Sequence, residues 1–288
     1  AQRDGVSWES LARSQIDLFT SDMTQLHVCA PNHFVPVTQV IPLIADCISA
    51  LMAKGATYTL DGDIYFNISP YLKDLPLPEK EALAIFAKRG GDPSRKGKQN
   101  PLDPLLWMQR RAGEPHWQTL IGNGRPGWHI ECSAMSSKYL GETFDIHGGG
   151  MDLQFPHHES EIAQSTIAHG HPPVRYWMHN NMITINGKKM GKSYNNVIKL
   201  SELFSGNHPL LEQAYHPMVV RFYILQTHYR STLDFGNEAL QGSERAFRRL
   251  WEAYEILQKL PSGDHATAAD AALDKQVNTW ISEFADFM

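Results

Sequence analysis

Histidine is concentrated in one part of this chain and limits what that part can fold into. The 288 residues include 14 histidines, of which eight lie between residues 116 and 179. They are His116, His129, His147, His157, His158, His169, His171 and His179. A local excess of this kind indicates metal or phosphate chemistry, although histidines also fill polar cores without either role.

Composition excludes several classes of protein. Hydrophobic residues make up 42% and charged residues 20% of the chain, as in ordinary globular domains. The longest apolar run covers residues 82–87, too short for a bilayer, so we expect no membrane partner. Three cysteines favour a reducing, cytoplasmic location without a disulfide-linked partner. A net charge of -5 excludes nucleic-acid binding through overall basicity.

The spacing of apolar residues predicts the local elements. Turn and cap residues set their limits: Asp61-Gly62 is typical of a hairpin turn, and Gly55 of a helix end. The expected elements are helices at 7–26 and 40–54, a hairpin at 57–68, a strand at 105–108, mostly helix from 200 onward, and a linker at 261–272.

Two separated segments offer metal ligands. Cys132 lies in GWHIECSAM, and PHHESE follows at residues 156–161. On a helix begun by Pro156, His157 and Glu161 share one face, and sulfur, imidazole and carboxylate together suit zinc. Spacing alone does not choose between His157 and His158, and a capped helix beside a buried cysteine is the alternative to a metal site.

Glycines and lysines mark two candidate ligand loops. Gly148, Gly149 and Gly150 follow an apolar run, where backbone could approach a ligand closely or form a plain tight turn. KKMGKS at 188–193 could place mobile charges near phosphates or be an ordinary surface loop. The basic segment at 88–100 is either a solvated loop or an RNA contact.

Taken together, these segments resemble cysteinyl-tRNA synthetase, a class I aminoacyl-tRNA synthetase. The resemblance is carried by GWHIECSAM, FDIHGGGMDLQFPHHESEIAQS, YWMHNNMITINGKKMGKS and FYILQTHYRSTLDF, which occur in this order. It implies an α/β fold: the second half of a Rossmann-like class I catalytic domain with a helical insertion, followed by the start of an all-α domain. Substrates are expected at the C-terminal edge of its parallel sheet, beside the glycine run.

The resemblance also implies roles for residues. The family holds one zinc ion with two cysteines, a histidine and a glutamate, and the matching ligands here are Cys132, His157 and Glu161. Trp128 would form a wall of the cysteine pocket, and His147 and Asp152 would lie near the amino acid or the nucleotide. The catalytic lysines Lys189 and Lys192, with Gly148 to Gly150, would bind ATP.

The implied reaction is the activation of L-cysteine by ATP with Mg²⁺ and its transfer to tRNA(Cys). Zinc would select the thiol, because a soft thiolate binds it far better than the hydroxyl of serine does. The alternatives are a cysteine ligase of mycothiol biosynthesis, which uses an amino-sugar acceptor, and a non-catalytic paralogue that binds tRNA or zinc.

The sequence departs from the family pattern in several places. Gly191 replaces the first serine of the Lys-Met-Ser-Lys-Ser loop. We find no His-x-Gly-His half, so the fourth zinc ligand is missing; Cys29 fits that role poorly, and Cys47 lies on an apolar helix face. His169-Gly170-His171 is interpreted as a loop. The chain is therefore interpreted as an internal fragment that lacks most of the anticodon-binding domain.

These assignments divide the chain into four parts. Residues 1–102 form the connective insertion, and 103–200 form the second catalytic half with the zinc site and lysine loop. Residues 201–260 form a helical region like a stem-contact domain, and 261–288 form the linker and the start of the C-terminal helical domain.

Overall fold

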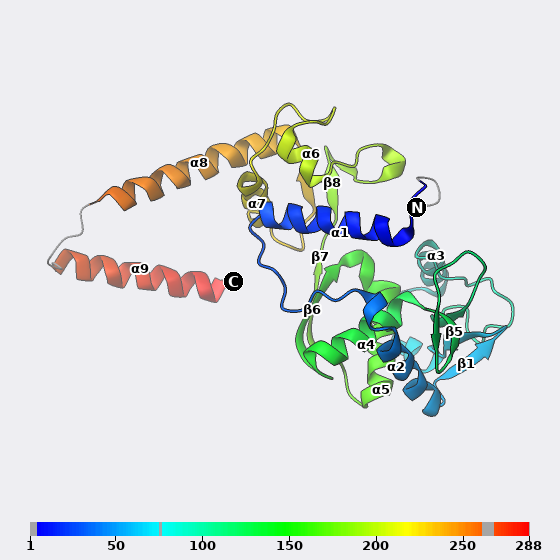
Figure 1. Ribbon diagram of the computed structural model, residues 1–288. Coiled ribbons are helices and arrows are strands. Elements are labelled where there is room, and N and C mark those ends of the chain that lie inside the picture. Colours follow the sequence, from blue (N-terminus) through cyan, green and yellow to red (C-terminus); the bar gives the residue numbers. More distant parts are fainter. Residues whose placement is uncertain (1–4, 75–76, 261–267, 288) are drawn as a thin grey trace.

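The computed structural model describes residues 5–74, 77–260 and 268–287 (Figure 1). Helices and strands are mixed along the chain, and the two longest helices of the described residues come last. The α-helices are α1 (Trp8–Gln25), α2 (Ile41–Ala53), α3 (Glu79–Lys88), α4 (Trp128–Leu140), α5 (Glu159–His169), α6 (Leu200–Ser205), α7 (Pro217–Leu225), α8 (Asn237–Lys259) and α9 (Ala268–Phe287).

The largest sheet of the described residues is antiparallel and has five strands in the order β1-β2-β3-β5-β4. The predicted hairpin is confirmed: β1 and β2 pair antiparallel across Asp61 and Gly62, which both adopt positive φ. The predicted boundary at 102/103 falls within this sheet, since β1 and β2 precede it and the other strands follow. The strands are β1 (Thr57–Leu60), β2 (Asp63–Phe66), β3 (Leu105–Gln109), β4 (Trp117–Thr119) and β5 (Gly122–Pro126).

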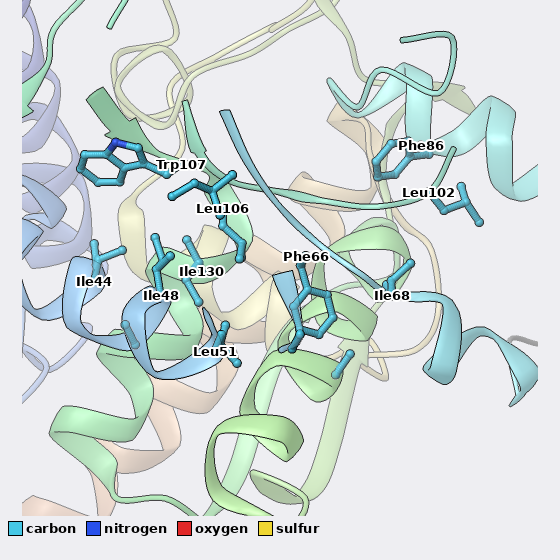
Figure 2. Close-up of a cluster of buried hydrophobic side chains, with 14 of the residues drawn as sticks. Ile44, Ile48, Leu51, Phe66, Ile68, Phe86, Leu102, Leu106, Trp107 and Ile130 are labelled. Atoms are coloured by element: carbon cyan, nitrogen blue, oxygen red, sulfur yellow. The ribbon is translucent and has the colours of Figure 1, made fainter. Parts of the chain in front are cut away.

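One apolar core joins this sheet to the helices that carry the candidate site. Ile44, Ile48 and Leu51 follow one face of α2 and are completely buried (Figure 2). They share a cluster with Leu106 of β3 and Ile130 of α4. Each such side chain contributes about 1.5–3 kcal/mol of burial free energy, so the first turn of α4 is held firmly against the core.

The parallel strands form two pairs. β6 (Phe144–Gly150) and β7 (Val174–Asn180) pair parallel and are connected through α5, as in a βαβ unit. β8 (Ile183–Ile185) pairs parallel with β10 (Leu233–Phe235) and antiparallel with β9 (Lys188–Lys189). The expected parallel element is therefore present at the glycine run, in a sheet separate from the larger antiparallel one.

The C-terminal part is helical, as predicted. α8 extends away from the sheets in Figure 1, and its large side chains Leu250, Trp251 and Leu257 are exposed. The linker prediction is partly wrong, because α9 begins at Ala268. The remaining linker positions, 261–267, lie outside the described residues.

Candidate metal and nucleotide site

The three predicted metal ligands come together in space. Cys132 lies one turn into α4, His157 lies in the kinked segment Gln154–His158 that leads into α5, and Glu161 lies in the first turn of α5. One ligand atom from each lies within 4.8 Å of the others. His157 Nε2 is 2.9 Å from Glu161 Oε1, as expected for side chains four residues apart on one helical face.

His157 is held by a stacked ring on one face and by a contact at Nδ1. The side chain is 4% exposed and stacks on Trp128, with ring centroids 4.4 Å apart. Its Nδ1 lies 2.8 Å from Nδ1 of His129. Trp128 itself is 44% exposed, so this indole borders an open space and is not part of the apolar core.

The electrostatics of this cluster suit a divalent cation. Glu161 is 2% exposed, and its Oε1 accepts no hydrogen bond from the described residues, although His157 Nε2 is close. Burial, together with the charges of Glu161 and Glu131, raises the pKa of the Cys132 thiol to about 12. A buried carboxylate without a donor, beside a thiol that ionises only with a cation at hand, is a fitting donor set for zinc.

A second group shares Glu161. His147, His158 and Glu161 also place one ligand atom each within 4.8 Å of one another. Burial lowers the pKa of His158 to about 3, so this imidazole is neutral, and its Nδ1 lies 2.8 Å from His179 Nε2. The Cys132 thiol belongs to the group that contains His157 and not to the group that contains His158. The two adjacent histidines, which spacing could not tell apart, therefore differ in their surroundings.

The glycine run makes room for neighbouring side chains. A Cβ at Gly149 would lie 2.8 Å from Cε1 of His158, and a Cβ at Gly150 would lie 2.4 Å from Oδ1 of Asp152. Asp152 in turn forms an ion pair with Arg89 at the end of α3, 3.0 Å away. The run therefore lets an imidazole and a carboxylate approach the end of β6.

The lysine loop is exposed but anchored. Lys189 and Lys192 are exposed, and neither forms an ion pair within the part of the chain that the structure describes. Asn196 holds the loop from inside: its Oδ1 accepts from the backbone N–H of Gly191 at 2.9 Å, and its Nδ2 donates to the carbonyl of Lys189 at 3.1 Å. Both ammonium groups are thus available to an anionic ligand.

Comparison with known proteins identifies the family. The profile of the tRNA synthetases class I (C) catalytic domain matches residues 1–245. The chain belongs to this family.

Curated relatives are similar over most of this chain. A cysteine–tRNA ligase of Cytophaga hutchinsonii is 44% identical over 91% of the chain, and one of Phocaeicola vulgatus is 50% identical over 71%. An L-cysteine:1D-myo-inositol 2-amino-2-deoxy-alpha-D-glucopyranoside ligase of Thermomonospora curvata is 41% identical over 96%. The chain spans 54%, 42% and 66% of these three relatives, respectively.

A solved structure supports the fold of this class I family member. Mycobacterium tuberculosis methionyl-tRNA synthetase in complex with methionyl-adenylate matches 99% of this chain and 67% of its own, with a TM-score of 0.64 and 15% identity. The predicted class I synthetase fold is therefore confirmed.

None of the described helices is both long enough and apolar enough to cross a bilayer.

Other sequence candidates lie elsewhere in this synthetase domain. Cys29 is exposed after α1 and belongs to neither ligand group, while Cys47 on α2 packs against the core. In the basic segment at 88–100, Arg95 binds the buried Asp63 at 2.5 Å, and Lys98 donates to the carbonyl of Pro101 at 2.7 Å. These two cations have structural partners, which favours a structural role for this part of the loop.

Sequence motifs missed several residues that surround the ligands. His129 was visible only as a member of the histidine-rich region, and His158 only as the alternative to His157. Trp177, which stacks on His147 at 4.6 Å and lies 4.8 Å from His158, was not singled out at all. The local excess of histidine was the available signal, since ring stacking between separate strands leaves no spacing pattern.

Proposed function

We propose that this protein activates L-cysteine with ATP and transfers it to tRNA(Cys), with a zinc ion selecting the thiol. The observation that carries the proposal is the convergence of Cys132, His157 and Glu161 in a family whose relatives include proteins named cysteine–tRNA ligase. Because tRNA works in the cytoplasm, we place the activity there.

Within the proposed site, Cys132, His157 and Glu161 would hold the zinc ion. A bound zinc ion would supply a soft Lewis acid for the substrate thiol. Trp128, exposed and stacked on His157, would shield one side of that thiol from water. His147 Nδ1 lies 3.6 Å from the other carboxylate oxygen of Glu161, Oε2, and burial lowers the pKa of this imidazole.

The lysine loop would stabilise the charge that develops on phosphate. The exposed amines of Lys189 and Lys192 could reach the α- and β-phosphates of ATP with Mg²⁺, while Gly148 to Gly150 and Asp152 would border the nucleotide. Such cations stabilise the in-line transition state in which the cysteine carboxylate attacks and pyrophosphate leaves. The four-part division of the chain stated above belongs to this proposal.

The test is cysteine-dependent ATP–pyrophosphate exchange by the full-length gene product. Exchange with cysteine and at least 10⁴-fold weaker exchange with serine would support zinc-based selection, because a site that makes a strong specific bond rejects the analogue that lacks it by about that factor. Exchange with both amino acids, or with neither, would contradict the proposal. Lys192→Ala should lower exchange and leave zinc content unchanged.

A second candidate acceptor is an amino-sugar. It is favoured by the 41% identity to the Thermomonospora curvata ligase, of which this chain spans the largest share among the relatives described above. Supplying tRNA(Cys) and a glucosaminyl-inositol in parallel assays decides between the two, since only the true acceptor will consume the activated cysteine.

A further inference from the structure

The first turn of α4 brings a second imidazole against the predicted zinc ligand. His129 and His157 meet through their Nδ1 atoms at 2.8 Å, and both side chains are buried. Two imidazole nitrogens at this distance need one proton between them, since two lone pairs would repel. The contact therefore has two possible forms, which differ in the ring that carries the proton.

The opposite edge of His157 decides between the two forms. If His129 carried the shared proton, the neutral His157 would hold its own at Nε2 and donate it to the nearest acceptor, Glu161. Nε2 lies only 2.9 Å from Oε1, yet this oxygen accepts no hydrogen bond from the described residues. Nε2 and Oε1 instead converge side by side, as two ligands of one ion do.

We infer that His129 is a positioning residue that fixes the tautomer of His157. The Nδ1–H of His157 donates to Nδ1 of His129, which leaves the lone pair of His157 Nε2 directed toward Cys132 and Glu161. This inference rests on the zinc site of the proposed function. Metal-binding histidines commonly donate their other N–H to an oxygen acceptor, and here a buried imidazole takes that place.

The location of His129 suits this role. It lies on the same helix as Cys132, three residues before it, and α4 is anchored in the core by the completely buried Ile130. The acceptor and the sulfur ligand are thus parts of one rigid element, while His157 comes from the separate turn before α5. A hydrogen bond between the two segments would orient the ring before any ion arrives.

The first test is the nitrogen NMR spectrum of the metal-free 288-residue chain. Long-range ¹H–¹⁵N correlations distinguish an imidazole protonated at Nδ1 from one protonated at Nε2. We expect His157 to be protonated at Nδ1 and His129 at Nε2. The reverse pair would overturn the inference, and this readout needs neither zinc nor activity.

The second test compares two variants of nearly equal shape. In His129→Asn the side-chain oxygen can take the place of Nδ1 and accept the same proton, whereas His129→Leu has no acceptor. We expect zinc affinity to fall about 10–100-fold in the leucine variant and to be largely kept in the asparagine variant. Equal losses in both, or no loss in either, would contradict the tautomer role.

Two controls separate the possible failures. His116→Leu changes an exposed histidine whose Nδ1 contacts the carbonyl of Glu114, and it should leave zinc affinity unchanged. If the full-length protein binds no zinc while His157 is protonated at Nδ1, the zinc-based function fails and the hydrogen-bond inference stands. If zinc binds and the tautomers are reversed, the inference alone fails.

Discussion

Two buried carboxylates of this chain are surrounded in opposite ways. Asp63, on β2 of the antiparallel sheet, is 0% exposed, and both of its oxygens are satisfied. Its Oδ2 receives Arg95 at 2.5 Å and Arg111 at 2.9 Å, and its Oδ1 receives the backbone N–H of Gln109 at 2.8 Å. Glu161 is buried to the same degree but has an oxygen without a donor, facing a thiol and an imidazole.

This difference distinguishes a structural charge from a functional one. A buried carboxylate is costly unless it is paired and hydrogen-bonded, and Asp63 meets both conditions with groups of the chain itself. Glu161 meets them only in part, because one of its oxygens has no donor from the described residues. A cation from outside the chain would supply the missing partner. The same criterion separates Arg95, which is used inside the fold, from the lysines of the KMGKS loop.

The largest expected effect is that of Asp63→Asn on stability. Removing one charge leaves Arg111 without its partner and Arg95 with only the exposed Asp61. The free energy of unfolding should therefore fall by about 3 kcal/mol, the low end for buried pairs because both guanidinium groups keep some solvent contact. Glu161→Gln in metal-free protein should cost under about 1 kcal/mol, since few contacts are lost. Urea denaturation with a chelator present measures both. Equal losses would remove the distinction between the two carboxylates.

Zinc should stabilise the chain through Cys132 and not through Cys47. At a free zinc concentration about 100 times its Kd, binding adds about 2.7 kcal/mol to the free energy of unfolding. Cys132→Ser should abolish this gain, whereas Cys47→Ser, another partly buried cysteine, should keep it. Thermal melts with zinc and with chelator give the two values. A gain that survives Cys132→Ser would place the ion elsewhere.

A third carboxylate, next to Cys132, allows a test by pH. Burial raises the pKa of Glu131 from 4.5 to about 7, opposed by Arg125. The pKa is raised in the folded state only, so the folded protein keeps its full stability below pH 4.5, where Glu131 is neutral in both states. That stability is lost as the pH rises through the folded-state pKa of about 7. Glu131→Gln should therefore be more stable by about 1–2 kcal/mol at pH 8, allowing for partial solvent contact, and equal at pH 4. A gain of the same size at both pH values would contradict this cause.

Local elements and ligands could be predicted from sequence because their signals are local. Asp61-Gly62 predicts the hairpin turn because these residue types tolerate the positive φ that such a turn needs. His157 and Glu161 are predicted to lie close together because residues four apart share one face of a helix. The choice of His157 over the adjacent His158 came from the resemblance to a family. The structure then brought the three predicted ligands together from two separate segments.

Contacts between distant segments could not be predicted in this way. The approach of His129 to His157, the stacking of Trp177 on His147 and the pairing of Asp152 with Arg89 depend on how α4, β7 and α3 pack. No spacing rule links them, since each pair joins elements that the core positions independently. The basic segment at 88–100 shows the same limit, because Arg95 contacts Asp63 of a strand 32 residues earlier in the chain.

The smallest expected effect concerns Gly191, where the lysine loop departs from its family pattern. Its φ of -174° is extended backbone that any residue adopts, and a Cβ there would lie 3.3 Å from Cδ2 of Tyr194, an exposed ring that can move. Gly191→Ser should therefore change the free energy of unfolding by less than about 0.5 kcal/mol.

The rate of ATP–pyrophosphate exchange by the full-length Gly191→Ser variant should change by less than about threefold, under 1 kcal/mol. The reason is that Asn196 already holds the loop through the N–H of residue 191 and the carbonyl of Lys189, so an added hydroxyl orders nothing further. Like Asp63, Asn196 is a buried polar group whose hydrogen-bond partners belong to the fold. The ammonium groups of Lys189 and Lys192 resemble Glu161 instead, because a ligand from outside the chain would supply their partners. A tenfold rise in exchange would show instead that the serine hydroxyl orients a lysine, and that the anchored backbone alone leaves the two charges poorly placed.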